Sequence, residues 1–108
     1  MAKASEITVL ETGDYAAWIT QLKDNRARLI VESRIARPRL GNIGDAKTVG
    51  EGVTELRIDH GPGYRVYFTR IGRVVVVLLC GGDKSSQAKD IRLAKQLAAS
   101  AREMIRDA

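Results

Sequence analysis

The sequence predicts an α+β domain in which a small, antiparallel sheet carries an N-terminal helical hairpin and a C-terminal helix. Three observations lead to this fold class. After a first short strand come two stretches with helical spacing, then three short strand-like segments joined by glycine-containing turns, and another helical stretch ends the chain. The expected order is βααβββα, with about four strands. At 108 residues the chain has the length of a single domain, 1–108.

The first third of the chain is predicted to form a strand and two helices. Residues 7–12, ITVLET, alternate weakly between apolar and polar, and Asp14 is a suitable N-cap for a helix that follows. That helix presents one apolar face through Tyr15, Trp18, Ile19 and Leu22. Asp24 can cap a second, strongly basic helix, which Pro38 ends because the residue before a proline avoids helical conformation.

The middle of the chain is predicted to supply the rest of the sheet. Residues 41–52, GNIGDAKTVGEG, are punctuated by glycine and are expected to be a loop that runs into a strand edge. The expected strands are VTELRI (53–58), YRVYFT (64–69) and RVVVVLLC (73–80). The turn HGPG (60–63) joins the first two. The third is continuously apolar from Val74, which is typical of a central strand covered on both faces.

A last helix is predicted to begin at Ser85 or Ser86, because serine is a favoured N-cap. Apolar residues then recur at helical spacing to the end of the chain, at Ile91, Ala94, Leu97, Ala98, Ala101, Met104 and Ile105.

Composition and charge narrow the classes of function. The 18 basic residues exceed the 13 acidic ones, and the net charge of +5 favours a polyanionic partner over an inert basic surface. One cysteine and one histidine exclude a zinc site built from those ligands, and no metal or other cofactor is expected. The longest apolar run, 74–80, is too short to span a bilayer, and the first residues lack a secretory signal, so we expect a cytoplasmic protein without membrane contact.

One face of the predicted sheet is polar. Glu55 and Arg57 share a face of their strand, as do Arg65 and Tyr67, and a matching hairpin register would join all four. Lys84 follows the third strand within reach of them. Such a face is expected to be solvated or to hold an anion. Alternatively, Glu55 simply pairs across the strands with Arg65.

Single residues outside this face have plainer interpretations. Cys80 ends an apolar run and is expected to be a small buried residue. His60 lies among glycines and is expected to be an exposed turn residue, with proton transfer as the alternative role.

The segments ELR (55–57), GPGYRVYF (61–68) and VVVVLLCGGDKSSQAKDI (74–91) resemble the RelE/ParE superfamily of toxins from type II toxin–antitoxin modules. The similarity is greatest to its HigB-like "addiction module killer" branch and covers nearly the whole chain. It implies a RelE-like fold, with a helical hairpin and a C-terminal helix around an antiparallel sheet. It also implies a toxin that enters the ribosome and cuts mRNA there, and a cognate antitoxin encoded next door, often with a helix-turn-helix.

The resemblance also implies roles for individual residues. Arg65 falls where the family has an arginine that contacts phosphate. Lys84 falls where a basic residue of the family assists at the scissile phosphate, and Arg57 lies on the same polar surface. Tyr67, which shares a strand face with Arg65, is expected to belong to the RNA-binding surface, with a packing role as the alternative to a catalytic one. Cleavage without a metal would proceed by attack of the RNA 2′-OH on the adjacent phosphate, with cations stabilising the charge that develops. Glu55 is the candidate base.

The chain departs from the family where other members carry catalytic groups. Some members have lysines where this chain has Val53 and Glu55, and others have tyrosine or histidine where it has Gln87 and Asp90. Two further functions therefore stay open: a DNA gyrase poison of the ParE kind, and a basic module that binds RNA or an acidic peptide without chemistry.

Overall fold

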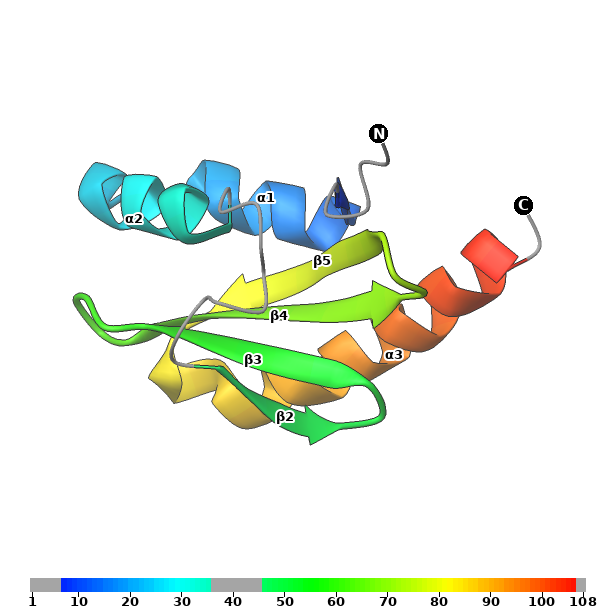
Figure 1. Cartoon of the computed structure of the whole chain (residues 1–108). Coiled ribbons are helices and arrows are strands. Elements are labelled where there is room, and N and C mark those ends of the chain that lie inside the picture. The colour runs from blue at the N-terminus through cyan, green and yellow to red at the C-terminus, as the bar shows by residue number, and fades with distance from the viewer. Residues whose placement is uncertain (1–6, 36–45, 107–108) are drawn as a thin grey trace.

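The computed structural model describes residues 7–35 and 46–106 (Figure 1). Its elements, in order, are β1 (Thr8–Glu11), α1 (Gly13–Gln21), α2 (Asn25–Ile35), β2 (Ala46–Gly50), β3 (Val53–Ile58), β4 (Tyr64–Ile71), β5 (Val75–Gly82), the 3₁₀ turn η2 (Lys84–Ser86) and α3 (Gln87–Arg106). This confirms the α+β class, the helical hairpin and the C-terminal helix. The predicted order was wrong in one respect, because four strands rather than three lie between α2 and α3.

The sheet has five strands in the order β1-β5-β4-β3-β2. Four of them form an antiparallel meander, whereas β1 pairs parallel with β5, so the sheet is mixed at one edge. The additional strand, β2, lies within the segment predicted as a loop. A tight turn at Glu51 and Gly52, both with positive φ, folds it back onto β3. The short polar strand is held by this pairing rather than by an apolar pattern of its own.

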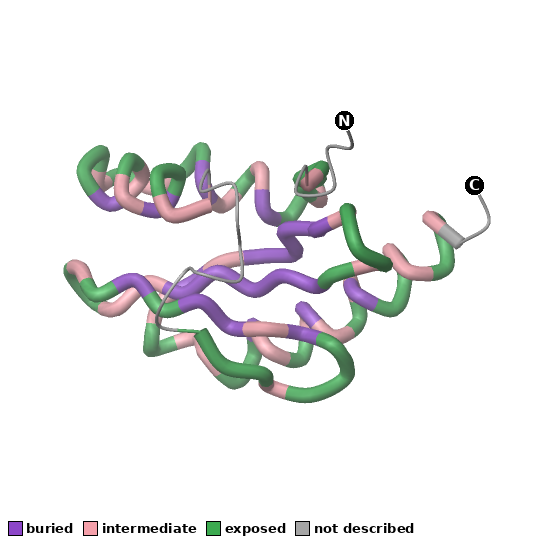
Figure 2. The backbone as a smooth tube through the Cα atoms, in the orientation of Figure 1, coloured by how far each residue is buried: buried purple, intermediate pink, exposed green. Residues whose placement is uncertain are grey.

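Helices cover both faces of the sheet (Figure 1). α1 and α2 lie over one face, where nine buried residues form a first core: Tyr15, Ile19, Val31, Leu56, Ile58, Val66, Phe68, Val76 and Leu78. α3 lies over the other face, where a second core contains Val53, Tyr67, Val77, Leu79, Cys80, Ala94 and Ala98. Strand β5 contributes to both cores, which confirms the prediction of a strand covered on both faces. Figure 2 shows the burial concentrated along β3, β4 and β5.

The helix caps agree with the sequence only in part. Asp24 accepts a hydrogen bond from Ala27 N at 3.1 Å, as expected of an N-cap of α2. Thr12 rather than Asp14 caps α1, because its Oγ1 accepts from Tyr15 N at 3.0 Å. Asp83 rather than a serine caps η2, which leads into α3. Pro38 lies outside the described residues.

Two adjacent glycines at the end of β5 bring both helical layers close to the sheet. A Cβ atom on Gly81 would collide with the Trp18 ring of α1. A Cβ atom on Gly82, on the opposite face, would collide with the carboxylate of Asp90 near the start of α3. Side chains larger than glycine would push these helices away. Gly81 therefore allows α1 to approach the sheet closely, and Gly82 does the same for η2 and the start of α3.

Candidate functional site

The strand register brings the predicted polar residues together. Glu55 pairs with Tyr67, and Arg57 pairs with Arg65. Because directly opposed residues of antiparallel strands project from the same face, all four side chains lie on the α3 side of the sheet. The juxtaposition expected from the sequence is thus observed.

The expectation that this face is solvated was wrong for most of it. Glu55 and Tyr67 are fully buried and Arg65 is 7% exposed, whereas Arg57 is exposed. The cause is α3, which covers the face and contributes Gln87 to it. Arg65 therefore reaches solvent only at the rim of the helix layer.

A buried network centres on the carboxylate of Glu55. Its Oε2 accepts hydrogen bonds from Tyr67 Oη at 3.0 Å and from Gln87 Nε2 at 2.8 Å. Arg65 Nε lies 3.7 Å from the same oxygen. Burial, and next the neighbouring Glu55, raise the pKa of the Tyr67 phenol. The alternative of a cross-strand Glu55–Arg65 pair thus holds, and Glu55 is enclosed by protein rather than open to a substrate.

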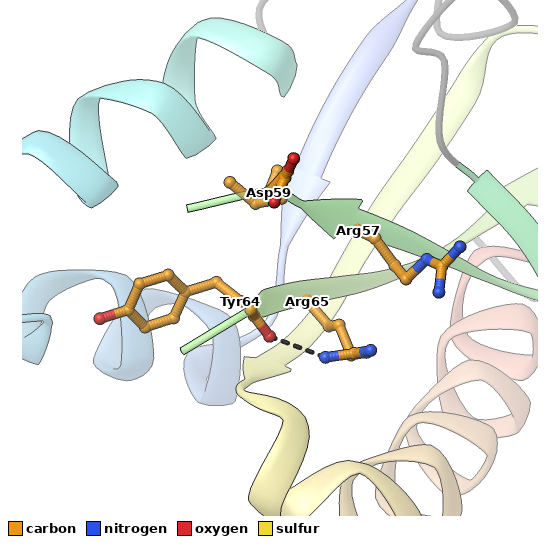
Figure 3. Close-up of a pocket in the computed structure, with 6 residues that line it drawn as sticks. Arg57, Asp59, Tyr64 and Arg65 are labelled. Carbon is orange, nitrogen blue, oxygen red and sulfur yellow. Dashed lines mark hydrogen bonds between the residues drawn. The ribbon is translucent and has the colours of Figure 1, made fainter. Parts of the chain in front are cut away.

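Beyond this network, the guanidinium of Arg65 reaches an open pocket of about 280 Å³. Arg65 Nη1 donates a hydrogen bond to the carbonyl of Gly63 at 2.7 Å, which orients the guanidinium. The pocket is lined by Arg57, Ile58, Asp59, Gly63, Tyr64 and Arg65. Figure 3 shows Arg57 and Arg65 extending to one side from neighbouring strands, while the Tyr64 ring turns away. Two cations therefore converge on a cavity large enough for a phosphate group.

Lys84 does not line this pocket but begins η2, two residues after Gly82, the register partner of Arg65. It is exposed. The neighbouring Asp83 accepts hydrogen bonds from Ser85 N at 2.9 Å and Ser85 Oγ at 2.5 Å. These bonds, chiefly that of the Ser85 side chain, together with the charge of Arg65, lower the pKa of Asp83. The start of η2 thus presents a lysine beside a carboxylate that stays ionised.

Comparison with known proteins places this site within a family. The family model described as "Phage derived protein Gp49-like (DUF891)" matches residues 17–103. The chain belongs to the Gp49-like family. An "Uncharacterized protein" of Haemophilus influenzae (strain ATCC 51907 / DSM 11121 / KW20 / Rd) is 50% identical over 92 residues, which cover 85% of this chain and 93% of that protein. The matched region of the Gp49-like model contains every residue of the site.

Two residues of this Gp49-like chain have roles that the sequence did not indicate. Asp59 is exposed and lines the pocket, two residues beyond Arg57. His60 was expected to be an exposed turn residue, but its Nε2 lies 3.1 Å from Asp24 Oδ2 and it is only partly exposed. This contact ties the turn between β3 and β4, which forms one wall of the pocket, to the start of α2. The i, i+2 spacing of Arg57 and Asp59 was the available signal for Asp59.

Other chemistry-bearing groups of this Gp49-like protein have structural surroundings. Cys80 is buried, as expected, and burial raises the pKa of its thiol to about 12. Within residues 7–35 and 46–106, no three His, Cys, Asp or Glu side chains gather as a metal site would require. None of the helices in these two ranges has the length and apolar character needed to cross a membrane.

Proposed function

We propose that this protein is the toxin of a type II toxin–antitoxin system and that it inhibits translation by cutting mRNA on the ribosome. The observation that carries the proposal is the convergence of Arg57 and Arg65 on an open pocket that also contains a carboxylate, Asp59. Membership of the Gp49-like family supports it, because this family is compatible with a toxin–antitoxin context.

Arg65 stabilises the transition state in this proposal. Attack by a 2′-OH on the adjacent phosphorus gathers negative charge on the phosphoryl oxygens, and a cation fixed in advance stabilises that charge without reorganisation. The planar guanidinium suits a bidentate contact with two phosphoryl oxygens. The Gly63 carbonyl and the buried Glu55 hold Arg65 in place. Glu55 therefore acts as a positioning residue in this mechanism.

Proton transfer falls to groups at the open side of the site. Glu55 was the candidate base in the sequence, but its enclosure beneath α3 separates it from the pocket. Asp59 lines the pocket and can accept the 2′-OH proton. The exposed Lys84 can add positive charge and donate a proton to the leaving oxygen.

This small set of groups explains why activity should depend on the ribosome. Holding the mRNA with its 2′-OH in line with the scissile bond contributes several kcal/mol, and the ribosome can supply that orientation. The protein then provides the cations and one carboxylate.

The first experiment compares cleavage with and without ribosomes. Purified protein is added to an mRNA in a translating extract and to the same mRNA alone, and the new 5′ ends are mapped. We expect cuts within the translated region in the extract and largely intact naked RNA. Equal cleavage in both samples would contradict ribosome dependence.

The second experiment tests the partner. A protein with a net charge of +5 is expected to bind an antitoxin that contributes acidic or apolar contacts. Co-expression with the neighbouring open reading frame should restore growth and yield a stable complex. If that neighbour neither binds nor restores growth, the toxin–antitoxin assignment fails.

Binding of a polyanion without chemistry is a second candidate function, favoured by the enclosure of Glu55. It differs from the first in its products. A binding module would inhibit translation, or retain RNA, without producing new 5′ ends. A gyrase poison would instead lower the supercoiling of relaxed plasmid by DNA gyrase, which a plasmid supercoiling assay detects.

A further inference from the structure

Strand β2 adds a lysine to the polar face of the sheet. Lys47 is the register partner of Glu55, which in turn pairs with Tyr67. Opposed residues in an antiparallel sheet share a face, so Lys47 projects on the same side as Arg57 and Arg65. Because residues 41–52 were predicted to be a loop that runs into a strand edge, this lysine was not among the candidates from the sequence.

The position of Lys47 differs from that of its neighbour Glu55 in one decisive respect. Glu55 is fully buried, whereas Lys47 lies one strand further out, on the edge strand, and is exposed. Two described acids lie near Lys47, its register partner Glu55 and, in the turn after β2, Glu51, and both contact other groups. Glu51 lies 3.8 Å from Lys95 Nζ, and Glu55 accepts from Tyr67 and Gln87. Among residues 7–35 and 46–106, no carboxylate pairs with Lys47, so its ammonium is available to a ligand at this edge.

The spacing between Lys47 and the pocket fits more than one phosphate group. Arg57 lies two residues along β3 from Glu55, so Lys47 and Arg57 are diagonal neighbours on the sheet, about 7–8 Å apart at their backbones. Arg65 lies one strand further, directly opposite Arg57. A single phosphate held between the two arginines leaves Lys47 to a second anionic group on the same ligand.

We propose that Lys47 binds a second phosphate of a single-stranded RNA whose first phosphate lies in the pocket of Arg57 and Arg65. The ligand of this surface is accordingly an oligonucleotide rather than a mononucleotide or free phosphate. This inference rests on the proposed function, because it assigns the direction in which the RNA leaves the pocket: across β3 toward β2.

The test measures binding of a fluorescently labelled hexaribonucleotide at several salt concentrations, with uridine monophosphate as a competitor that carries one phosphate. Wild type is compared with Lys47→Gln, Lys47→Arg, Arg65→Ala and a control, Lys23→Gln. Lys23 is an exposed lysine between α1 and α2, on the other side of the sheet. Lys47 and Lys23 are both exposed, so neither substitution should disturb the fold.

Loss of one phosphate contact should flatten the salt dependence measurably. For single strands the slope of log K against log salt changes by about 0.7 per contact, so Lys47→Gln should lower the slope by about 0.7. Lys47→Arg should keep the wild-type slope, and Lys23→Gln should leave it unchanged. The inhibition constant of uridine monophosphate should be equal for wild type and Lys47→Gln, because its one phosphate binds in the pocket.

The possible outcomes separate this inference from the proposed function. A wild-type slope in Lys47→Gln, with weaker binding in Arg65→Ala, would overturn the Lys47 contact and leave the pocket in place. An equal loss of slope in Lys23→Gln would also overturn it, because the effect would then be one of net charge. If Arg65→Ala binds as wild type does, the phosphate pocket on which the proposed function depends fails as well.

Discussion

Removing the hydroxyl of Tyr67 isolates the buried network beneath α3. In Tyr67→Phe the ring and its packing remain, but Glu55 loses the donor that lies 3.0 Å from its Oε2. Both side chains are fully buried, so water does not replace the lost bond. A hydrogen bond to a charged group contributes about 1.5–3 kcal/mol. We take about 2 kcal/mol, which at roughly 4 °C per kcal/mol for a chain of this size corresponds to a Tm lowered by roughly 8 °C.

The assay is thermal and urea-induced unfolding followed by circular dichroism. The matched control is Tyr64→Phe, which removes the hydroxyl of a half-buried tyrosine outside the network and should lower Tm by only a degree or two. Translation inhibition by Tyr67→Phe should fall as well, because Glu55 is then less firmly held against Arg65. If Tyr67→Phe and Tyr64→Phe have the same Tm, the network does not stabilise the fold as described.

Three further predictions concern other parts of the fold. Gly82→Ala should destabilise the protein by about 1–3 kcal/mol in urea unfolding, because the new Cβ meets the Asp90 carboxylate, whereas Gly13→Ala, where a Cβ has open space, should not. The hydrogen bond from the backbone at the start of α2 holds the pKa of Asp24 below its usual value of 3.8. The stability that Asp24 contributes is therefore present above about pH 4 and lost as the pH falls through the lower folded pKa, so unfolding from pH 5 to 2 should be less pH-dependent in Asp24→Asn. Cys80 is buried with a pKa near 12, so iodoacetamide at pH 8 should alkylate it only in urea, and rapid alkylation of the native protein would contradict its burial.

The pairing of the site residues could be predicted from the sequence because the pattern and the turn act together. Alternation in VTELRI and YRVYFT assigns each side chain to a face, and the GPG turn between them sets the register that opposes Arg57 to Arg65. Both inferences are local. They required no knowledge of how the helices pack.

The burial of that face could not be predicted in the same way. Polar residues on one face of a strand predict that this face is exposed to solvent, unless another element supplies hydrogen-bond partners for them. Here α3 brings Gln87, which donates to Glu55, and small residues such as Ala94 and Ala98 let the helix approach the sheet. That a polar side chain near the start of the last helix faces inward depends on tertiary packing, so the sequence indicated a solvated face and Glu55 as a base.

Strand β2 was missed for a related reason. Its residues AKTVG have little apolar character, and all but one of them are exposed. The strand forms because the turn at Glu51 and Gly52 returns the chain onto β3, whose backbone groups then pair with it. The same pairing is what places Lys47 beside the site.

Single-turnover cleavage of mRNA on programmed ribosomes, by wild type and by Arg65→Ala, tests the central claim most directly. Loss of one preorganised charge at the scissile phosphate costs about 3–4 kcal/mol, so Arg65→Ala should cut about 100- to 1000-fold more slowly while remaining folded at the assay temperature. Arg65 lies 3.7 Å from the buried Glu55, so its removal can also affect stability. A thermal melt of each variant, followed by circular dichroism, shows whether it is folded at the assay temperature. Cleavage at the wild-type rate by folded Arg65→Ala would contradict the role assigned to this site.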